Sequence, residues 1–160
     1  MGTKKLKLSY LLIPLITILV SYTGSIFTSM GINSGWYDLI NKPSWTPPGS
    51  VIGIVWTIIF ILSTISALIV WNKLEKDKRF WRIIYLFVIN AGLNVFWSFL
   101  FFAQGLMGLA MIEAALLGIS VYILIYLIWP ESKLAASLLI PYALWVSFAT
   151  FLNYSIWILN

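Results

Sequence analysis

The sequence contains no cysteine and no histidine, and only five of its 160 residues are acidic. Thiol nucleophiles, disulfides, thiolate metal sites and imidazole acid–base catalysis are therefore excluded. Charged residues amount to 9% of the chain, whereas a soluble domain carries roughly a quarter. A hydrolytic or metal-dependent active site has almost no residues from which it could be built, so we expect neither a metal site nor a conventional enzyme.

Apolar residues dominate what remains, at 61% of the chain. A helix needs about 20 consecutive apolar residues to cross a bilayer, and the chain is long enough for several such helices but for no separate soluble domain. The sequence predicts an all-α membrane protein in which residues 1–160 form one transmembrane domain, with a bend at Pro141. Its five expected spans are residues 8–30, 47–71, 81–103, 106–129 and 134–158.

The basic residues are distributed unevenly between the loops that join these spans. Nine of the ten fall on one side of a five-span protein, and only Lys42 falls on the other. Loops rich in lysine and arginine stay in the cytoplasm, which predicts the orientation of an integral, multi-pass protein, one that we expect in a bacterial cell membrane. Its N-terminus would lie inside, and its first loop and C-terminus outside. This topology accounts for the net charge of +5 without a nucleic-acid partner. The nine are Lys4, Lys5, Lys7, Lys73, Lys76, Lys78, Arg79, Arg82 and Lys133.

The loop between the first two spans, residues 31–46, is rich in aromatic residues and is followed by further prolines. It contains Trp36, Tyr37 and Trp45. Loops of this length are usually functional or disordered, but prolines have little backbone freedom to lose and aromatic rings have a large area to bury. We therefore predict a fixed lid with little regular structure that lies on the helices. Thr46 is the expected N-cap of the second span.

Tryptophan and polar residues also occur at depth within the expected spans. At 1.5 Å per residue, Trp56, Trp97 and Trp145 lie too deep for the aromatic belt at a membrane surface. Amide side chains at such depths are costly unless they are paired or face a cavity. Either they join helices to one another or they line a binding pocket, and for the whole set we favour a pocket for a flat apolar ligand with polar edges. The two stripes are Asn90, Asn94, Trp97 and Phe101, and Tyr142, Trp145, Ala149 and Asn153.

Two further features of the spans are open to more than one interpretation. For Glu113 and Asn153 taken singly, helix packing and ligand contact are equally good explanations. A proton relay through Glu113 would need partners, yet no histidine, lysine or arginine is available at that depth. In the first span, small residues recur at helical spacing, which we interpret as a packing face rather than a ligand contact. They are Thr17, Ser21, Gly24, Ser25 and Thr28.

Three separate motifs, in order along nearly the whole chain beyond the first span, resemble the translocator protein family. This family is also known as the peripheral benzodiazepine receptor family, and its bacterial members are called tryptophan-rich sensory proteins. The first motif lies in the lid and the start of the second span, the second in the third span, and the third in the fifth span. They are Trp36-Tyr37 with Lys42-Pro43-Ser44-Trp45-Thr46-Pro47-Pro48 and Trp56; Leu93-Asn94 with Trp97-Ser98 and Phe101-Phe102; and Pro141-Tyr142 with Trp145-Val146-Ser147-Phe148-Ala149, Leu152-Asn153-Tyr154 and Trp157.

The resemblance implies a five-helix bundle, commonly a homodimer in the lipid bilayer, with a pocket beneath the first loop. That pocket would bind tetrapyrroles such as protoporphyrin IX, or synthetic ligands of the benzodiazepine-receptor type, and no cofactor would be required. The resemblance also leaves open a light-dependent breakdown of porphyrin with Trp56 and Trp145 as candidate reactive residues, or a regulatory or transport role without turnover. With the depth argument for Trp97, the expected ligand-binding residues are Tyr37, Trp45, Trp56, Asn90, Asn94, Trp97, Trp145 and Ala149.

Two absences narrow the expected ligand. The family's sterol motif needs a lysine or arginine after an aromatic residue, and no basic residue follows Tyr154. Iron porphyrins are held by histidine, cysteine, methionine or tyrosine, and the first two are missing here. A metal-free tetrapyrrole is therefore the better expectation than haem or a sterol.

Overall fold

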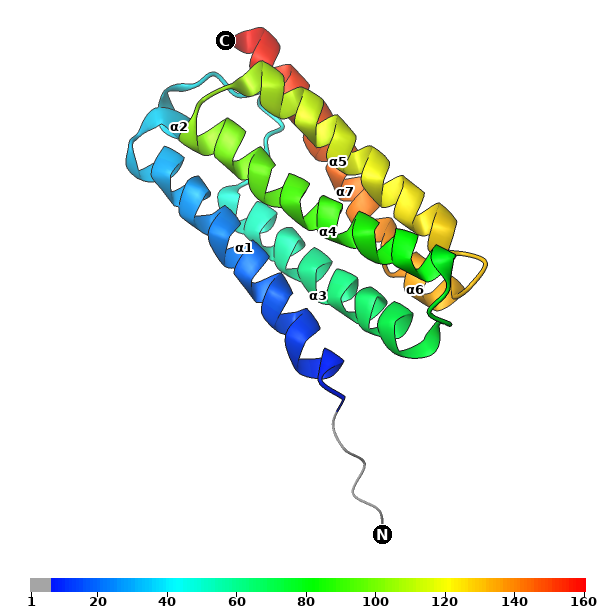
Figure 1. Ribbon diagram of the computed structural model, residues 1–160. Helices are drawn as coiled ribbons and strands as arrows, with labels where there is room; N and C mark the ends of the chain where they lie inside the picture. The colour runs from blue at the N-terminus through cyan, green and yellow to red at the C-terminus, as the bar shows by residue number, and fades with distance from the viewer. Residues whose placement is uncertain (1–6) are drawn as a thin grey trace.

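The computed structural model of the protein describes residues 7–160, and every regular element in that range is helical (Figure 1). Five helical segments are long and apolar enough to cross a membrane, which confirms the predicted all-α, five-helix architecture. Short elements extend or connect the long helices. The elements are α1 (Ser9–Asn33), α2 (Trp36–Leu39), α3 (Gly49–Lys73), α4 (Lys78–Ser98), η1 (Phe99–Ala103), α5 (Met107–Ile128), α6 (Lys133–Ser137) and α7 (Ile140–Leu159).

The five long helices differ greatly in how much of their surface is buried. Helix α5 packs against both α4 and α7 and contributes nine buried residues. Small residues allow the close approach, since a Cβ at Gly118 would lie 3.4 Å from Val146 of α7. Helix α1 packs against α3, α4 and η1 and buries only Ser9, Gly24 and Gly31. The bundle is therefore tight around α5 and loosely closed along α1.

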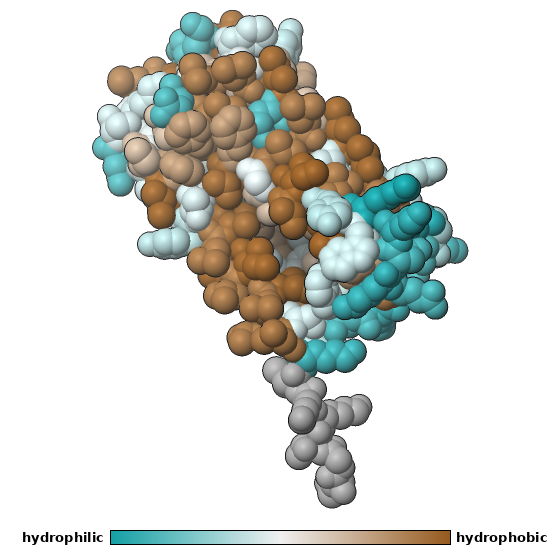
Figure 2. Space-filling view, in the orientation of Figure 1, coloured by the Kyte–Doolittle hydropathy of each residue, from teal (hydrophilic) through white to brown (hydrophobic). Residues whose placement is uncertain are grey.

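The two ends of the bundle differ in charge. The basic end carries Lys7, the α3–α4 connection and Lys133, and it forms the large hydrophilic patch in Figure 2. The lid end carries the 34–48 segment, Lys42 and the C-terminus (Figure 1). Lys4 and Lys5, which also entered the charge count, lie outside the described residues. The surface between the ends is largely apolar, as a bilayer requires.

The lid is more regular than the sequence indicated. Residues Trp36–Leu39 form the short helix α2, and α3 begins only at Gly49 with Pro48 before it. Thr46 is therefore not the N-cap, because its hydroxyl donates instead to the carbonyl of Pro43 at 2.7 Å within a local turn. Pro48 has extended backbone angles and delays the helix to the next residue. The predictions that the lid has little regular structure and that Thr46 caps the second span were wrong, while the prediction of a structured lid is confirmed.

The fifth span is irregular next to Pro141, where the sequence predicted a bend, and Leu138 and Leu139 between its two helices keep right-handed helical backbone angles. Helix α6 ends at Ser137 and α7 begins at Ile140, so that Pro141 lies in the first turn of a new helix. A proline costs nothing there, because the first N–H groups of a helix have no partner within it. The hydroxyl of Ser66 donates to the carbonyl of Ala135 at 2.8 Å and fixes α6 to α3.

Candidate functional site

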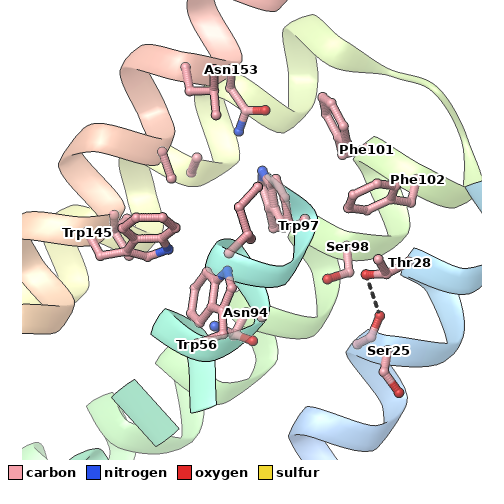
Figure 3. A pocket seen from close by; sticks show the side chains of 18 of the residues that line it. Ser25, Thr28, Trp56, Asn94, Trp97, Ser98, Phe101, Phe102, Trp145 and Asn153 are labelled. Carbon is pink, nitrogen blue, oxygen red and sulfur yellow. Dashed lines mark hydrogen bonds between the residues drawn. The ribbon is translucent and has the colours of Figure 1, made fainter. Parts of the chain in front are cut away.

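A cavity of about 360 Å³ lies between the helices in the half of the bundle next to the lid. All five spanning helices and the lid contribute to its wall (Figure 3). Six of the eight residues expected from the sequence to bind ligand line it. They are Tyr37, Trp56, Asn94, Trp97, Trp145 and Ala149.

The three deep tryptophans turn into this cavity from three different helices (Figure 3). The ring of Trp97 stacks on Phe101 at 5.4 Å between centroids, with an angle of 11° between the planes. Trp56 meets Tyr142 edge to face at 5.9 Å, and Trp145 lies 5.3 Å from Phe148. Neighbouring rings therefore hold each indole in place, and together the indoles form an aromatic wall.

Three hydrogen-bond donors on this wall are buried and have no partner among residues 7–160. They are Nε1 of Trp97, Nε1 of Trp145 and Nδ2 of Asn153. Buried polar groups in proteins are nearly always hydrogen-bonded, and each exception needs an explanation. Here all three belong to residues that line one cavity, and Figure 3 shows their side chains directed to a common space. The arrangement suits an apolar ligand that carries hydrogen-bond acceptors.

The floor of the cavity is a chain of satisfied hydrogen bonds. Asn94 donates through Nδ2 to the hydroxyl of Tyr142 at 3.2 Å, and that hydroxyl donates to Oδ1 of Asn90 at 3.2 Å. Nδ2 of Asn90 donates in turn to the hydroxyl of Ser120 at 2.8 Å. Asn90 lies beneath the floor and does not line the cavity. The structure therefore separates Asn90, which joins α4, α5 and α7, from Asn94, which also faces the cavity.

A π-helical turn at the end of α4 shapes the wall next to the lid. In η1 the N–H of Gln104 donates to the carbonyl of Phe99 at 3.0 Å, a bond across five residues. The consecutive residues Phe101 and Phe102 of this wider turn both line the cavity, and π-turns are frequent at functional sites. The one-face pattern at 90, 94, 97 and 101 predicted Phe101 alone. Phe102 was not part of that pattern; it follows Asn94 and Ser98 at spacings of four, and both of these residues also line the cavity.

The lid rests on this turn through its own aromatic residues. Tyr37 lies 5.5 Å from Phe102 between ring centroids, and the ammonium of Lys42 stands 4.5 Å above the Tyr37 ring. Burial, with a smaller contribution from the nearby Asp38 carboxylate, raises the pKa of the Tyr37 phenol. Tyr37 is thus held as a neutral hydroxyl at the cavity wall.

Trp45 does not line the cavity. Its ring stacks on Phe151 at 5.5 Å and 12°, and 44% of the residue is exposed. It packs the lid onto the outside of α7, where the C-terminal residue adds further bonds. Asn41 and Asn160 exchange two hydrogen bonds of 2.9 Å, from the Asn41 N–H to Oδ1 and from Nδ2 to the Asn41 carbonyl. The sequence indicated that the lid is fixed but not that α7 fixes it.

Helix α1 supplies a polar wall that the sequence assigned to packing. Four residues of its small-residue face, and Ser29 one turn beyond, line the cavity. The same face of α1 also packs against other helices. A Cβ at Gly24 would lie 3.5 Å from the hydroxyl of Ser98 on α4. The hydroxyl of Thr64 on α3 donates to that of Thr17 at 2.9 Å. Small residues permit both roles, so their spacing alone could not separate them. The four are Ser21, Gly24, Ser25 and Thr28.

Glu113 lies beside the cavity wall rather than on it. It is buried, and neither carboxylate oxygen has a hydrogen-bond partner among the described residues. Its neighbours Ala114 and Leu117 on α5 reach the cavity. In the part of the chain that the structure describes, no group of three or more acidic side chains could hold a metal ion.

The geometry defines a class of protein, namely a helical membrane protein with an aromatic-walled cavity beneath a structured loop. The profile of the TspO/MBR family matches residues 11–158, and the chain belongs to this family. It is 37% identical to the tryptophan-rich protein TspO of Bacillus cereus, over 97% of this chain and 99% of the relative. It is 34% identical to the TspO of Archaeoglobus fulgidus, over 91% and 93% of the two chains. The human translocator protein is 32% identical, over 85% and 80%.

Proposed function

We propose that the protein is a membrane receptor or carrier that binds a flat tetrapyrrole, such as protoporphyrin IX, in the cavity beneath the lid. The observation that carries the proposal is the set of three unpaired N–H donors on an indole wall. A macrocycle offers large faces for stacking, and its carboxylates and ring edges offer acceptors for the donors. Synthetic ligands of the benzodiazepine-receptor type, which are also apolar and carry carbonyl groups, would compete for the same space.

A gap between α1 and α3 gives such a ligand access to the cavity from the lipid side. Exposed residues at this edge of the cavity wall are small on both helices, namely Ser25 and Ser29 of α1 and Gly49, Gly53 and Thr57 of α3. A Cβ added at Gly49 or Gly53 would meet no atom within 4 Å. At about 360 Å³ the cavity is near the lower limit for ligand pockets. We expect one edge of a macrocycle to remain in this gap.

Binding is tested by titrating protoporphyrin IX into the detergent-solubilised protein and following the porphyrin absorbance. The double variant Trp145→Phe/Asn94→Ala removes one unpaired donor and one polar group of the floor, and its affinity should fall at least tenfold. Trp129→Phe is the matched control, because Trp129 is exposed at the basic end and should bind as the wild type does. Equal affinity of all three proteins would overturn the proposal.

The position of two indoles in one cavity favours a second candidate, a light-dependent breakdown of bound porphyrin. Trp56 and Trp145 both line the space that a macrocycle would fill. Photoexcited porphyrin would take one electron from an indole, and dioxygen would be the oxidant consumed. Porphyrin absorbance should then decay faster under light with the wild type than with Trp56→Phe/Trp145→Phe at equal occupancy. Equal decay rates would leave binding alone.

A further inference from the structure

A second cavity, of about 190 Å³, lies in the half of the bundle next to the basic end. It is enclosed by α1, α3, α4 and the side chain of Tyr142, and it shares only Phe60 and Asn94 with the first cavity. Its wall is mainly aliphatic and aromatic. The polar side chains on it are Thr17, Ser63, Asn90 and Asn94, of which only the Ser63 hydroxyl is buried without a partner in residues 7–160. The shape and chemistry differ from those of the indole-walled cavity.

This second cavity opens toward lipid on one side. Helix α1 is tied to α3 by the hydroxyl of Ser9, which donates to Oδ1 of Asn72 at 3.0 Å, and by the Thr64–Thr17 bond. Corresponding bonds between α1 and α4 are absent from this half of the described chain. At that edge Ile16 and Val88 line the cavity while remaining 55% and 65% exposed. Figure 2 shows a hollow in this face, near the middle of the molecule.

At the basic end the cavity stops at Trp71, and a free cation stands over that ring. The ammonium of Lys76 lies 4.6 Å from the Trp71 ring and 5.6 Å from the Phe80 ring. Lys76 is exposed and forms no ion pair among the described residues. Of the neighbouring acidic groups, Asp77 accepts the N–H of Phe80 at 2.8 Å and caps α4, and Glu75 is exposed. The five basic residues of the 73–82 segment, which joins the end of α3 to the start of α4, outnumber these two acidic ones.

We propose that the second cavity binds one acyl chain of an anionic phospholipid. The chain would enter from the bilayer between α1 and α4, and the headgroup would bind at Lys76 beside Trp71. An acyl chain fits because the wall is apolar and the opening faces the hydrocarbon core, where neither water nor a polar ligand is supplied. A negative headgroup fits because a lysine near a membrane surface attracts it. This proposal does not depend on what occupies the first cavity.

The test uses phosphatidylglycerol and phosphatidylcholine that carry a photoactivatable diazirine in one acyl chain. Each is added to the purified protein in detergent, crosslinked, and mapped by mass spectrometry of peptides. We expect adducts concentrated at Ala67 and Ala91, which line the cavity on α3 and α4. Phosphatidylglycerol should label these positions about fivefold more than phosphatidylcholine, and Lys76→Gln should remove that preference.

Two cavity-filling variants make the test specific. Ala67→Phe should abolish the cavity adducts, whereas Ala149→Phe fills the first cavity and should leave them unchanged. If Ala67→Phe does not fold, Ala91→Leu fills the same space from α4. Adducts spread over all lipid-facing helices, or unaffected by either filling variant, would overturn the site. Equal labelling by the two lipids, unchanged by Lys76→Gln, would overturn the headgroup assignment.

Discussion

A substitution at Asn153 tests whether this residue serves ligand binding or protein stability. Its Nδ2 is buried without a partner on the cavity wall. Burying an amide without a hydrogen bond costs roughly 1–3 kcal/mol. Asn153→Leu removes that cost, because it replaces the amide by an apolar side chain with the same number of heavy atoms. We expect its free energy of unfolding to equal that of the wild type or to exceed it by about 1 kcal/mol.

The same substitution should weaken ligand binding. A lost hydrogen bond to a neutral acceptor is worth about 1 kcal/mol, or roughly fivefold in affinity, and a bond to a carboxylate is worth tenfold or more. Protoporphyrin IX titrated into wild type and Asn153→Leu, together with reversible unfolding in mixed detergents, measures both quantities. The two effects have opposite signs, which a merely structural residue does not produce.

Asn90→Leu is the matched control on the satisfied network. Asn90 makes two hydrogen bonds with side chains, at 2.8 Å and 3.2 Å, and does not line the first cavity. At about 0.6 kcal/mol per interhelical bond, its loss should destabilise the protein by about 1 kcal/mol. If Asn153→Leu instead loses stability as Asn90→Leu does and retains wild-type affinity, Asn153 joins helices and our argument from unpaired donors fails.

Three further predictions concern helix packing, the lid and the basic end. Gly31→Val should lower the free energy of unfolding by about 1–3 kcal/mol, because a Cβ there would lie 2.7 Å from the Phe102 carbonyl oxygen. Thermal unfolding measures this loss, and a midpoint equal to that of the wild type would contradict the prediction. The raised pKa of Tyr37 means that the folded state holds its phenolic proton more tightly than the unfolded state, so stability should fall as pH rises above about 10. Tyr37→Phe should flatten that fall in melts between pH 9 and 11, and an unchanged slope would refute it. Glu131→Gln removes the charge from a part-exposed 3.3 Å ion pair with Arg79 and should lower the free energy of unfolding by less than about 1 kcal/mol. This difference between variant and wild type should vanish when unfolding is measured at high salt.

The sequence predicts which residues face the interior of the bundle better than where along a helix a cavity ends. Depth arithmetic placed Trp56, Trp97 and Trp145 below the aromatic belt, and all three line the first cavity. Helical spacing placed Asn90 and Asn94 on one face, yet the structure puts only Asn94 on this cavity. A separation of four residues is about 6 Å along the axis, and a floor one side chain thick fits within that distance. No periodicity can locate such a floor.

Local departures from regular helix geometry account for the other differences. The third span ends in the π-turn of η1, and the fifth span is interrupted between Ser137 and Ile140. Composition reveals neither feature, because apolar residues run through both places without interruption. Proline at 141 indicated a disturbance in the right region, but the same residue is compatible with a bend, a break or a first turn.

The sequence alone does not distinguish several polar or aromatic residues that lie deep in the spans, namely Trp56, Trp97, Asn94 and Asn153. In the structure they differ in whether the side-chain N–H group has a hydrogen-bond partner. Asn94 is satisfied by Tyr142, whereas Trp97 and Asn153 keep unpaired N–H groups on a cavity wall. Glu113 is likewise buried, and its two carboxylate oxygens have no partner in residues 7–160. Burying donors and acceptors without hydrogen bonds costs free energy of folding. Natural proteins retain such costs chiefly at functional sites.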